Sequence, residues 1–371
     1  MQDNVIPVPF LDLTREFKSL ESEWLDAIRA TGQAGSFILG PNVQAFEKEL
    51  ADYVGVKHAI GVANGTDSLI LSLRAMGIGK GHEVITTPFT FFASSEAIDT
   101  VGATPVFADI EPGSFCIDPA SIARCITPRT RAILPVHIFG HPCDMPAIMT
   151  IAKKHNLVVL EDCAQAFGAR SAGNVVGAIG DAGSFSFYPT KVLGGYGDGG
   201  MITTNSDELN ERIRRLRNHG AIKPFVHVEI GTNSRLDEIQ ASVLRLKLRQ
   251  IDRAVVGRRR VAAAYTKRLQ GTAVVVPPLP TNGEHAFNLY TIRTANRDRV
   301  RQTLTDQKIG TSQCYPEGLH LQEVYRHLGY KAGTLPVCEK ATTETLSLPI
   351  YPDMPEAHID RVCEVLLAAI R

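Results

Sequence analysis

The sequence predicts an α/β fold, in which a large domain with a mainly parallel sheet flanked by helices precedes a small C-terminal α+β domain. Three observations support this prediction. From residue 58 onward, short apolar runs alternate with helical patterns, as strand–helix–strand crossover units require. The runs LVVL (157–160) and AILPV (132–136) are apolar without alternation, which is typical of strands buried on both faces. A proline-rich stretch, 274–283, then interrupts the pattern, which restarts beyond it.

The first 162 residues contain most of the predicted crossover units. Two amphipathic helical patterns come first, at 15–30 and 41–54, and we expect them to pack against one or both domains. Apolar runs then predict strands at 58–63, 83–87, 104–110, 131–138 and 157–162. The segments between them predict helices at 67–77, 91–102, 118–126 and 145–156.

The remaining pattern sets the domain boundary. Helices are predicted at 206–220, where Ser206 is placed as the N-cap, and over a longer region, 236–269. After the proline-rich stretch the pattern predicts two strands, 288–294 and 311–315, and two helices, 297–310 and 354–370. We therefore expect a large domain over 1–270, which includes the N-terminal helical segment, and a small α+β domain over 271–371.

Composition excludes several classes of protein. Lysine plus arginine and aspartate plus glutamate both total 39, so the formal net charge is zero and nothing global favours nucleic acid or an anionic membrane. No stretch approaches a membrane span, and no export signal is recognised. The odd number of scattered cysteines shows neither CxxC nor metal-ligand spacing, so we expect reduced thiols, no metal site and a cytoplasmic protein. They are Cys116, Cys125, Cys143, Cys163, Cys314, Cys338 and Cys363.

Polar residues follow several predicted strands, where open α/β sheets collect their ligands. The strand at 157–162 ends in Asp162, and the strand at 58–63 is followed by Asn64, Gly65 and Thr66. Thr66 thus lies near a helix N-terminus, whose unpaired N–H groups favour an anion such as phosphate. Taken singly, these features are better explained by an ordinary turn and helix caps than by a ligand site.

The segment GSFSFYPTKVLGGYGDGG (183–200) favours a ligand site when it is considered together with these features. Alone, Lys191 reads as a solvated lysine and the glycines as a hairpin turn. Together with an anion site, aromatic residues and an acid, however, they match a ligand that has a phosphate, an aromatic ring and an electrophilic aldehyde. Pyridoxal 5′-phosphate is such a ligand. Lys191 would form an imine with it and later move a proton, Asp162 would keep the ring nitrogen protonated, and the glycines would let the backbone approach the ligand closely.

At these residues the chain resembles the DegT/DnrJ/EryC1/StrS family of sugar aminotransferases, a branch of the fold-type I pyridoxal-phosphate enzymes. The resemblance runs nearly end to end, and several long motifs in the right order make it specific. The motifs are SFILGPNVQAFEKELADYVGVKHAIGVANGTDSL, LEDCAQAFGA, GSFSFYPTKVLGGYGDGGMITTN, LRNHG, GTNSRLDEIQASVL and IGTSQCYPEGLHLQ.

The resemblance implies a role for each residue that matches a family motif. Lys191 of SFYPTK would form the imine with the cofactor, Asp162 of EDCAQ would pair with the pyridine nitrogen, and Gln165 would lie near the ring and its hydroxyl. The other implied cofactor contacts are Gly65, Thr66 and Ser186 at the phosphate and Phe91 stacked on the ring.

Asn233 of GTNSR matches a residue that reaches the phosphate from the partner subunit. The resemblance therefore implies a homodimer whose active sites lie at the subunit interface.

The function implied by the resemblance is amino transfer from glutamate to a nucleotide-diphosphate-linked keto-sugar. The segments 288–294 and 314–330 look most like members that aminate C3, which we favour over C4. Tyr315 and His320 are candidates to line the sugar site, although His320 is equally well explained as a packed loop histidine. A dehydratase branch of the family has histidine at the position of Lys191, so the lysine argues against that branch.

Two alternatives remain open. The acceptor could be a keto-cyclitol without a nucleotide, or the protein could be a regulatory relative that keeps the fold without turnover. The presence of Lys191, Asp162 and Gln165 argues against the second alternative.

Overall fold

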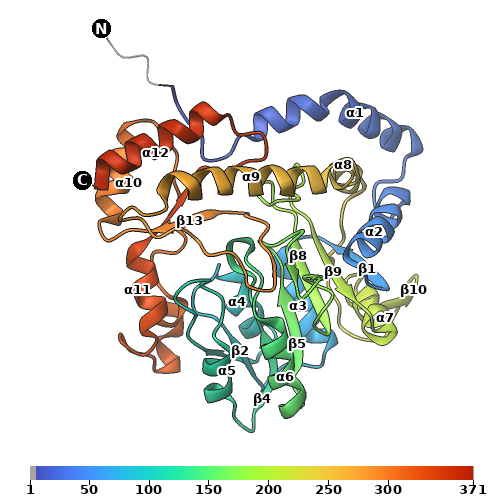
Figure 1. The fold of residues 1–371 in the computed structure, drawn as a ribbon. Coiled ribbons are helices and arrows are strands. Elements are labelled where there is room, and N and C mark those ends of the chain that lie inside the picture. Colours follow the sequence, from blue (N-terminus) through green and yellow to red (C-terminus); the bar gives the residue numbers. More distant parts are fainter. Residues whose placement is uncertain (1–5, 371) are drawn as a thin grey trace.

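A mainly parallel sheet forms the centre of the molecule. The computed structural model describes residues 6–370, and within them seven strands form one sheet in the order β1-β9-β8-β5-β4-β2-β3 (Figure 1). Neighbouring strands are parallel from β8 to β3, whereas β9 is antiparallel to both β1 and β8. The strands are β1 (His58–Val62), β2 (Glu83–Thr86), β3 (Thr104–Phe107), β4 (Thr130–Leu134), β5 (Val158–Asp162), β8 (Ala182–Ser186) and β9 (Gly200–Thr204). The predicted sheet is therefore confirmed.

Helices cover both faces of this sheet. α3 contacts α4, and α5 contacts α6. The chain moves one way along the sheet through α3 and α4 and returns through α5 and α6, so right-handed crossovers place the two pairs on opposite faces. The helices up to residue 270 are α1 (Leu13–Ala34), α2 (Pro41–Val54), α3 (Gly65–Ala75), α4 (Ala93–Thr100), α5 (Pro119–Cys125), α6 (Met145–His155), α7 (Asp207–Leu216), α8 (Glu238–Leu248) and α9 (Ile251–Leu269).

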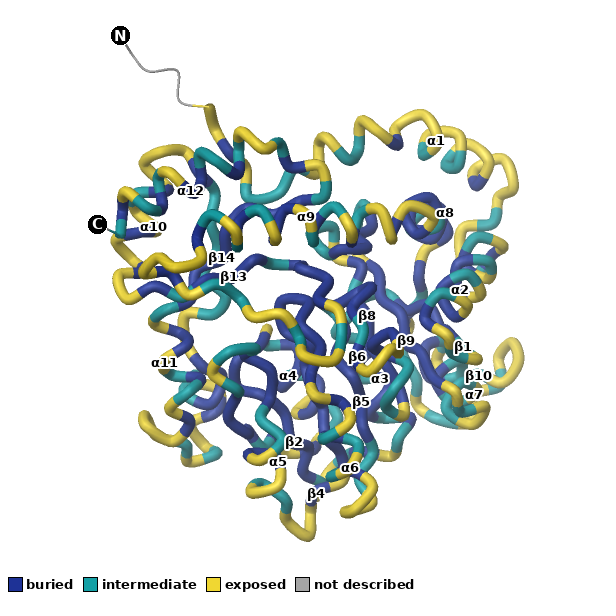
Figure 2. Tube along the Cα trace, viewed as in Figure 1, coloured by how far each residue is buried: buried dark blue, intermediate teal, exposed yellow. Residues whose placement is uncertain are grey.

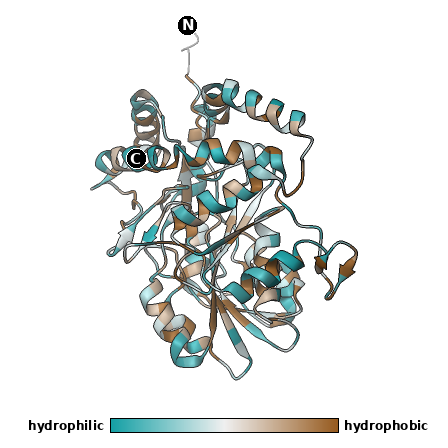
Figure 3. Ribbon diagram, turned by 90° about the vertical axis from the view of Figure 1, so that its right-hand side faces the viewer, coloured by the Kyte–Doolittle hydropathy of each residue, from teal (hydrophilic) through white to brown (hydrophobic). Residues whose placement is uncertain are grey.

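The strands supply the core. Ala132, Ile133 and Leu134 of β4 are all fully buried, as are Val159 and Leu160 of β5. Figure 2 shows these strands as the buried interior, and Figure 3 shows hydrophobic strands surrounded by helices of mixed hydropathy. Apolar runs without alternation thus reflect burial on both faces. Within residues 6–370, no helix is both long and apolar enough to cross a lipid bilayer.

The C-terminal part has its own core around an antiparallel pair of strands. It consists of β13 (Tyr290–Arg293), β14 (Thr345–Leu348), α10 (Arg297–Asp306), α11 (Pro336–Glu344) and α12 (Glu356–Ile370). Tyr265 of α9 belongs to this core, and Val8 near the N-terminus bridges to Ile309. We keep the division at residue 270 as a proposal, with α9 contributing to both parts.

Short elements complete the fold. They are β6 (Arg170–Ser171), β7 (Asn174–Val175), β10 (Ala221–Lys223), β11 (Val226–His227), β12 (Gly283–Glu284) and three short 3-10 turns at 138–140, 319–321 and 323–328. β12 pairs with β6, so the chain returns to the large part before it enters β13.

Three expectations need correction. The segment 311–315 is not a strand: only Ser312 bridges to β14, at Ser347, because the following residues turn away and Tyr315 reaches Gln165. The second strand of the pair is instead β14, which the pattern did not indicate. The long helical region breaks into α8 and α9 after Leu248, and α7 ends at Leu216, four residues before Gly220.

Candidate active site

Asp162 ends β5 at the carboxyl edge of the sheet, where the sequence placed it. Its side chain is buried, and its two oxygens have separate donors: the Ser94 hydroxyl donates to Oδ2 at 2.8 Å and the Ala164 N–H donates to Oδ1 at 3.1 Å. Burial raises the pKa of Asp162, and the bonds from Ser94 and Ala164 oppose that rise, as does the charge of Lys191. The carboxylate is thus held rigidly in a poorly hydrated place.

Lys191 lies in the loop between β8 and β9, with its backbone N–H bonded to the Tyr188 carbonyl at 2.9 Å. The residue keeps some exposed surface, but surrounding atoms shield its ammonium, so burial lowers the pKa of Lys191. The opposite charge of Asp162 partly offsets this effect. Lys191 and Asp162 are therefore near enough for their charges to influence each other, and a larger share of Lys191 is neutral than in an exposed lysine.

The N-terminus of α3 meets the end of β8. Asn64 caps the helix by accepting from the Asp67 N–H at 2.8 Å, and α3 begins at Gly65, two residues before the predicted start. The expectation that Thr66 lies near a helix N-terminus is confirmed. The first N–H groups of a helix have no partner within the helix, which makes this end attractive to anions. A Cβ on Gly65 would lie 2.6 Å from the Cβ of Ser186. Glycine therefore allows this close approach, which brings Gly65, Thr66 and Ser186 to one place.

Gln165 links the large part to the C-terminal part. Its Oε1 accepts from the Phe139 N–H at 2.9 Å, and its Nε2 donates to the Tyr315 hydroxyl at 2.8 Å. These bonds fix the orientation of the amide. Burial raises the pKa of Tyr315, so this hydroxyl keeps its proton. The structure thus brings Gln165 and Tyr315 together beside Asp162, whose charge also acts on Tyr315.

Phe91 lies between β2 and α4 with 61 % of its surface exposed. Its carbonyl accepts from the Ser94 N–H at 3.2 Å, which places the exposed ring one turn from the residue that holds Asp162. Tyr188, three residues before Lys191, is also an exposed aromatic. A large apolar ring left in water is available to stack on a ligand.

Two predicted site residues lie apart from this group. Asn233 is exposed and bridges to Asn218, in the segment that follows the β10–β11 hairpin. His320 is only 1 % exposed, and its Nε2 is 3.2 Å from Glu339 Oε1. The side chain of His320 therefore pairs with α11, and the Tyr330 ring packs against its edge.

Two of the glycines after Lys191 lie against side-chain atoms of α8. A Cβ on Gly195 would lie 2.8 Å from Gln240 Oε1, and one on Gly197 would lie 2.7 Å from Gln240 Nε2. Gln240 also accepts from the Tyr196 N–H at 2.9 Å, and Lys247 donates to the Gly194 carbonyl at 2.5 Å. Gln240 of α8 therefore crowds Gly195 and Gly197, and glycine at these two positions lets this part of the loop pack tightly under that helix. The nearest atoms to a Cβ on Gly194 and on Gly200 would instead be the carbonyl oxygens of Pro189 and Asn64.

Sequence reasoning missed two kinds of residue. Ser94 contacts Asp162, yet it only appeared within the predicted helix at 91–102. Gln240 and Lys247 of α8 form hydrogen bonds with the backbone of the Lys191 loop. Both residues lie in a region that was predicted only as helical. Polar residues on a buried helix face were the only signal available for them.

His137, Glu161 and Cys163 offer ligand atoms within 4.8 Å of one another. All three are buried, but hydrogen bonds already occupy the first two. Glu161 accepts from three backbone N–H groups and from His137 Nε2, and His137 Nδ1 accepts from the Cys143 N–H. The arrangement matches a satisfied structural carboxylate.

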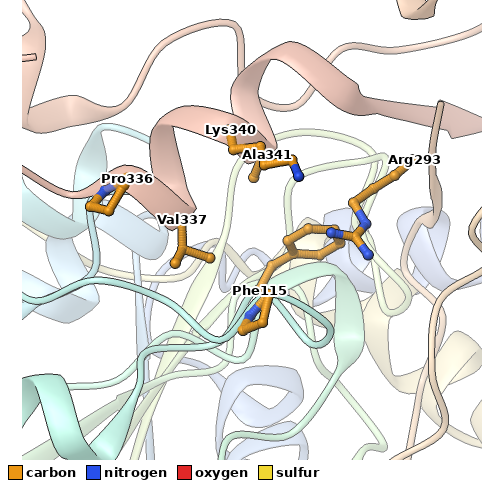
Figure 4. Close-up of a pocket in the computed structure, with 7 residues that line it drawn as sticks. Phe115, Arg293, Pro336, Val337, Lys340 and Ala341 are labelled. Carbon is orange, nitrogen blue, oxygen red and sulfur yellow. The ribbon is translucent and has the colours of Figure 1, made fainter. Parts of the chain in front are cut away.

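Two cavities lie around this region. Lys191 borders one of about 490 Å³, between α1, α9 and 351–353, which Lys247 and Arg258 also line. A second, of about 270 Å³, lies between the loop carrying Phe115 and α11, with Arg293 and Lys340 at its edge (Figure 4). Lys191 does not line the second cavity.

Comparisons with known proteins agree with this geometry. A model of the DegT/DnrJ/EryC1/StrS aminotransferase family matches residues 18–367. The chain is 47 % identical to a pleiotropic regulatory protein of Geobacillus stearothermophilus, covering 96 % of this chain and 97 % of that protein. It is 44 % identical to a UDP-N-acetyl-3-dehydro-alpha-D-glucosamine 3-aminotransferase of Acidithiobacillus ferrooxidans, covering 97 % of both chains.

The fold has a close counterpart among solved structures. The crystal structure of DesV from S. venezuelae, in complex with a ketimine intermediate, matches with a TM-score of 0.96 and 41 % identity. The match covers 98 % of this chain and 99 % of that one.

Proposed function

Because the chain belongs to the DegT/DnrJ/EryC1/StrS aminotransferase family, whose members are pyridoxal-phosphate-dependent sugar aminotransferases, we propose that it converts a nucleotide-diphosphate-linked keto-sugar to the amino-sugar. We propose amination at C3 in preference to C4, with glutamate as the amino donor. The observation that carries the proposal is the shielded ammonium of Lys191 near the buried carboxylate of Asp162 at the carboxyl edge of the sheet.

The residues around this pair suit pyridoxal 5′-phosphate. Gly65, Thr66 and Ser186 would hold the phosphate, since they meet at the N-terminus of α3 where backbone N–H groups are free. The exposed ring of Phe91 would stack on the cofactor ring, and Asp162 would face its nitrogen. When bound, the cofactor supplies an electrophilic aldehyde and a ring that accepts electrons.

The chain's own residues have separate tasks in this proposal. Lys191, whose pKa is lowered by burial, has a neutral fraction that can attack a carbonyl and later carry a proton between substrate carbon and cofactor. Asp162, held by Ser94 and Ala164, keeps a proton on the ring nitrogen. Gln165 is already bonded to Tyr315 and Phe139, so it can orient the cofactor hydroxyl without reorganising.

The preference for C3 is supported by the similarity to the Acidithiobacillus aminotransferase, whose name states a 3-amino transfer. Of the two proposed substrate residues, Tyr315 is the stronger, because its hydroxyl stands beside Gln165. His320 is fully buried against Glu339, so we propose that contact with the sugar comes from Tyr315.

We also propose a homodimer with shared active sites. The β10–β11 hairpin stands at the edge of the molecule (Figures 1 and 2), where Phe225 between its strands is 95 % exposed and Ile230 just after β11 is 85 % exposed. Exposure of such large apolar side chains favours their burial in an interface with a partner subunit. Asn233 follows shortly after this segment and is exposed, so a partner that covers the hairpin could also contact Asn233.

We also propose a cytoplasmic location. The seven cysteines, all within the described residues, are free thiols, which suits a reducing compartment.

A regulatory role is the second candidate, because the relative from Geobacillus stearothermophilus is named a regulatory protein. The presence of Asp162, Gln165 and Lys191 favours catalysis, since a protein without turnover has no use for a shielded lysine ammonium near a buried carboxylate. A keto-cyclitol acceptor remains the alternative within catalysis.

The first test records the visible absorption of the purified protein before and after addition of L-glutamate without acceptor. We expect a yellow protein whose band is lost with glutamate and returns with a 3-keto nucleotide sugar. Lys191→Ala should lose the yellow band and turnover, whereas Lys153→Ala, which changes an exposed lysine of α6, should keep both. A protein that remains colourless with added cofactor would support the regulatory candidate. Return of the band with a keto-cyclitol alone would support that alternative.

A further inference from the structure

The carboxylate of Asp162 lies at the end of a chain of two hydroxyl groups. Ser94 Oγ is 2.8 Å from Asp162 Oδ2, and Thr90 Oγ1 is 3.1 Å from Ser94 Oγ. Both hydroxyl residues are buried, and Ser94 is only 1 % exposed. All three groups are therefore shielded from water, which makes their mutual hydrogen bonds strong and their loss costly.

The direction of these bonds follows from the number of protons. A carboxylate only accepts, so Ser94 must donate its single proton to Asp162. Ser94 then has only lone pairs left for Thr90, and Thr90 must donate to Ser94. Both hydroxyl protons thus point toward Asp162 as long as Asp162 is ionised, and each bond polarises the next.

We propose that Ser94 is a positioning residue that, assisted by Thr90, keeps Asp162 ionised and aligned so that the ring nitrogen of the cofactor stays protonated. This inference rests on the proposed function, because it concerns the same cofactor. Ala164 restrains the other oxygen, Oδ1, so both carboxylate oxygens are anchored while each keeps a lone pair for the ring.

The other side chains around Asp162 do not supply the hydrogen bond that Ser94 donates to its carboxylate. The titratable side chains that face it are Lys191, His137, Cys163 and Tyr315. Lys191 is needed for the cofactor, His137 is paired with Glu161, and Tyr315 is bonded to Gln165. Ser94 is the side chain that donates a hydrogen bond directly to the carboxylate, and that bond is the largest influence opposing the effect of burial on the pKa of Asp162.

Ser94 lies close to Phe91 in the chain. Ser94 lies in the first turn of α4, and its N–H bonds to the carbonyl of Phe91. The same turn would therefore position both the Phe91 ring, which stacks on the cofactor, and the Ser94 hydroxyl, which holds Asp162 near the ring nitrogen of the cofactor. Stacking and protonation of the cofactor would be set by one short segment.

The test loads the protein with pyridoxal phosphate labelled with ¹⁵N in the ring and measures the nitrogen chemical shift, which reports whether that nitrogen carries a proton. Wild type is expected to show a protonated nitrogen, and Ser94→Ala a shift toward the unprotonated form. Loss of one bond to a charged group should also weaken cofactor affinity about tenfold. The midpoint pH of the visible band should rise by about one unit, since a ring without its positive charge makes the nitrogen linked to Lys191 more basic.

Three further variants separate positioning from general damage. Ser94→Thr keeps a hydroxyl and should restore the wild-type nitrogen shift and midpoint pH. Thr90→Val should give a smaller change in the same direction, which keeps the test informative if Ser94→Ala fails to fold. Ser95→Ala removes the neighbouring hydroxyl, which bonds to the Phe92 carbonyl, and should behave as wild type.

The outcomes distinguish this inference from the proposed function. A wild-type protein that binds no labelled cofactor would overturn both. Cofactor binding with an unchanged nitrogen shift and midpoint pH in Ser94→Ala would overturn the role of Ser94 alone. Equal changes in Ser94→Ala and Ser95→Ala would also overturn it, because they would indicate a loosened start of α4.

Discussion

Replacing Glu161 with glutamine tests whether the polar cluster behind Asp162 is a satisfied structural unit. Glu161 is fully buried, and its carboxylate accepts four hydrogen bonds. Oε1 accepts from the N–H groups of Ile179 at 2.8 Å and Gly180 at 2.7 Å. Oε2 accepts from the Gly177 N–H at 2.9 Å and from His137 Nε2 at 3.1 Å. Glutamine has one acceptor oxygen, so its NH₂ group must face two of these donors.

The magnitude follows from counting the donors left without an acceptor. If the NH₂ group faces Ile179 and Gly180, two buried N–H groups are orphaned. If it faces Gly177 and His137, the histidine cannot change tautomer, because its Nδ1 already accepts from the Cys143 N–H at 3.0 Å. Each orphaned donor costs about 1–3 kcal/mol, so Glu161→Gln should lower the free energy of unfolding by about 2–6 kcal/mol.

Urea denaturation of the cofactor-free protein, followed by circular dichroism, measures this loss as a lower midpoint. Glu364→Gln is the matched control, because it changes an exposed glutamate on α12 and should stay within about 0.5 kcal/mol of wild type. A loss below about 1 kcal/mol in Glu161→Gln would refute the reasoning, since it would mean that the four donors find other partners.

Three further predictions concern the cofactor site and the interface. Gly65→Ala places a Cβ 2.6 Å from the Cβ of Ser186, so cofactor affinity measured by absorbance titration should fall at least about tenfold; wild-type affinity would contradict the proposed phosphate site. Burial lowers the pKa of Lys191 below the ordinary value of 10.5, so between these values the unfolded chain holds a proton that the folded chain releases. The free energy of unfolding of the cofactor-free protein should therefore rise with pH across that window, and urea denaturation of Lys191→Gln should lack this rise; an identical pH slope would argue against a shielded lysine. Phe225→Ser combined with Ile230→Ser should shift the protein to monomers in sedimentation at micromolar concentration, whereas an intact dimer would place the interface elsewhere.

Local sequence patterns determined the order of the strands and α-helices as far as β5, and several site positions. Unbroken apolar runs located β4 and β5, and the Asn64-Gly65-Thr66 turn before a helical pattern located the N-terminus of α3. These features could be predicted because backbone conformation and burial depend on nearby residues: a strand buried on both faces must be apolar, and the start of a helix needs a capping side chain. The positions of Asp162 and Lys191 followed from the same local signals together with the family resemblance.

The contacts that make these residues a site depend on the tertiary structure. Ser94 meets Asp162 across 68 positions of sequence, and Gln165 meets Tyr315 across 150. The conformation of 311–315 also depends on residues distant in sequence. Tyr315 is hydrogen-bonded to Gln165, and β14 pairs with β13 in place of this segment.

The glycines after Lys191 show the limit of local reasoning most directly. Their spacing indicated a need for close approach, but a glycine records only that a side chain is excluded and carries no information about what excludes it. Sequence alone could therefore determine that the loop around Lys191 is crowded. Only the packing of α8 decided that Gln240 occupies the space beside Gly195 and Gly197, because side chains far apart in sequence become neighbours only when the sheet order and the helices above it are set.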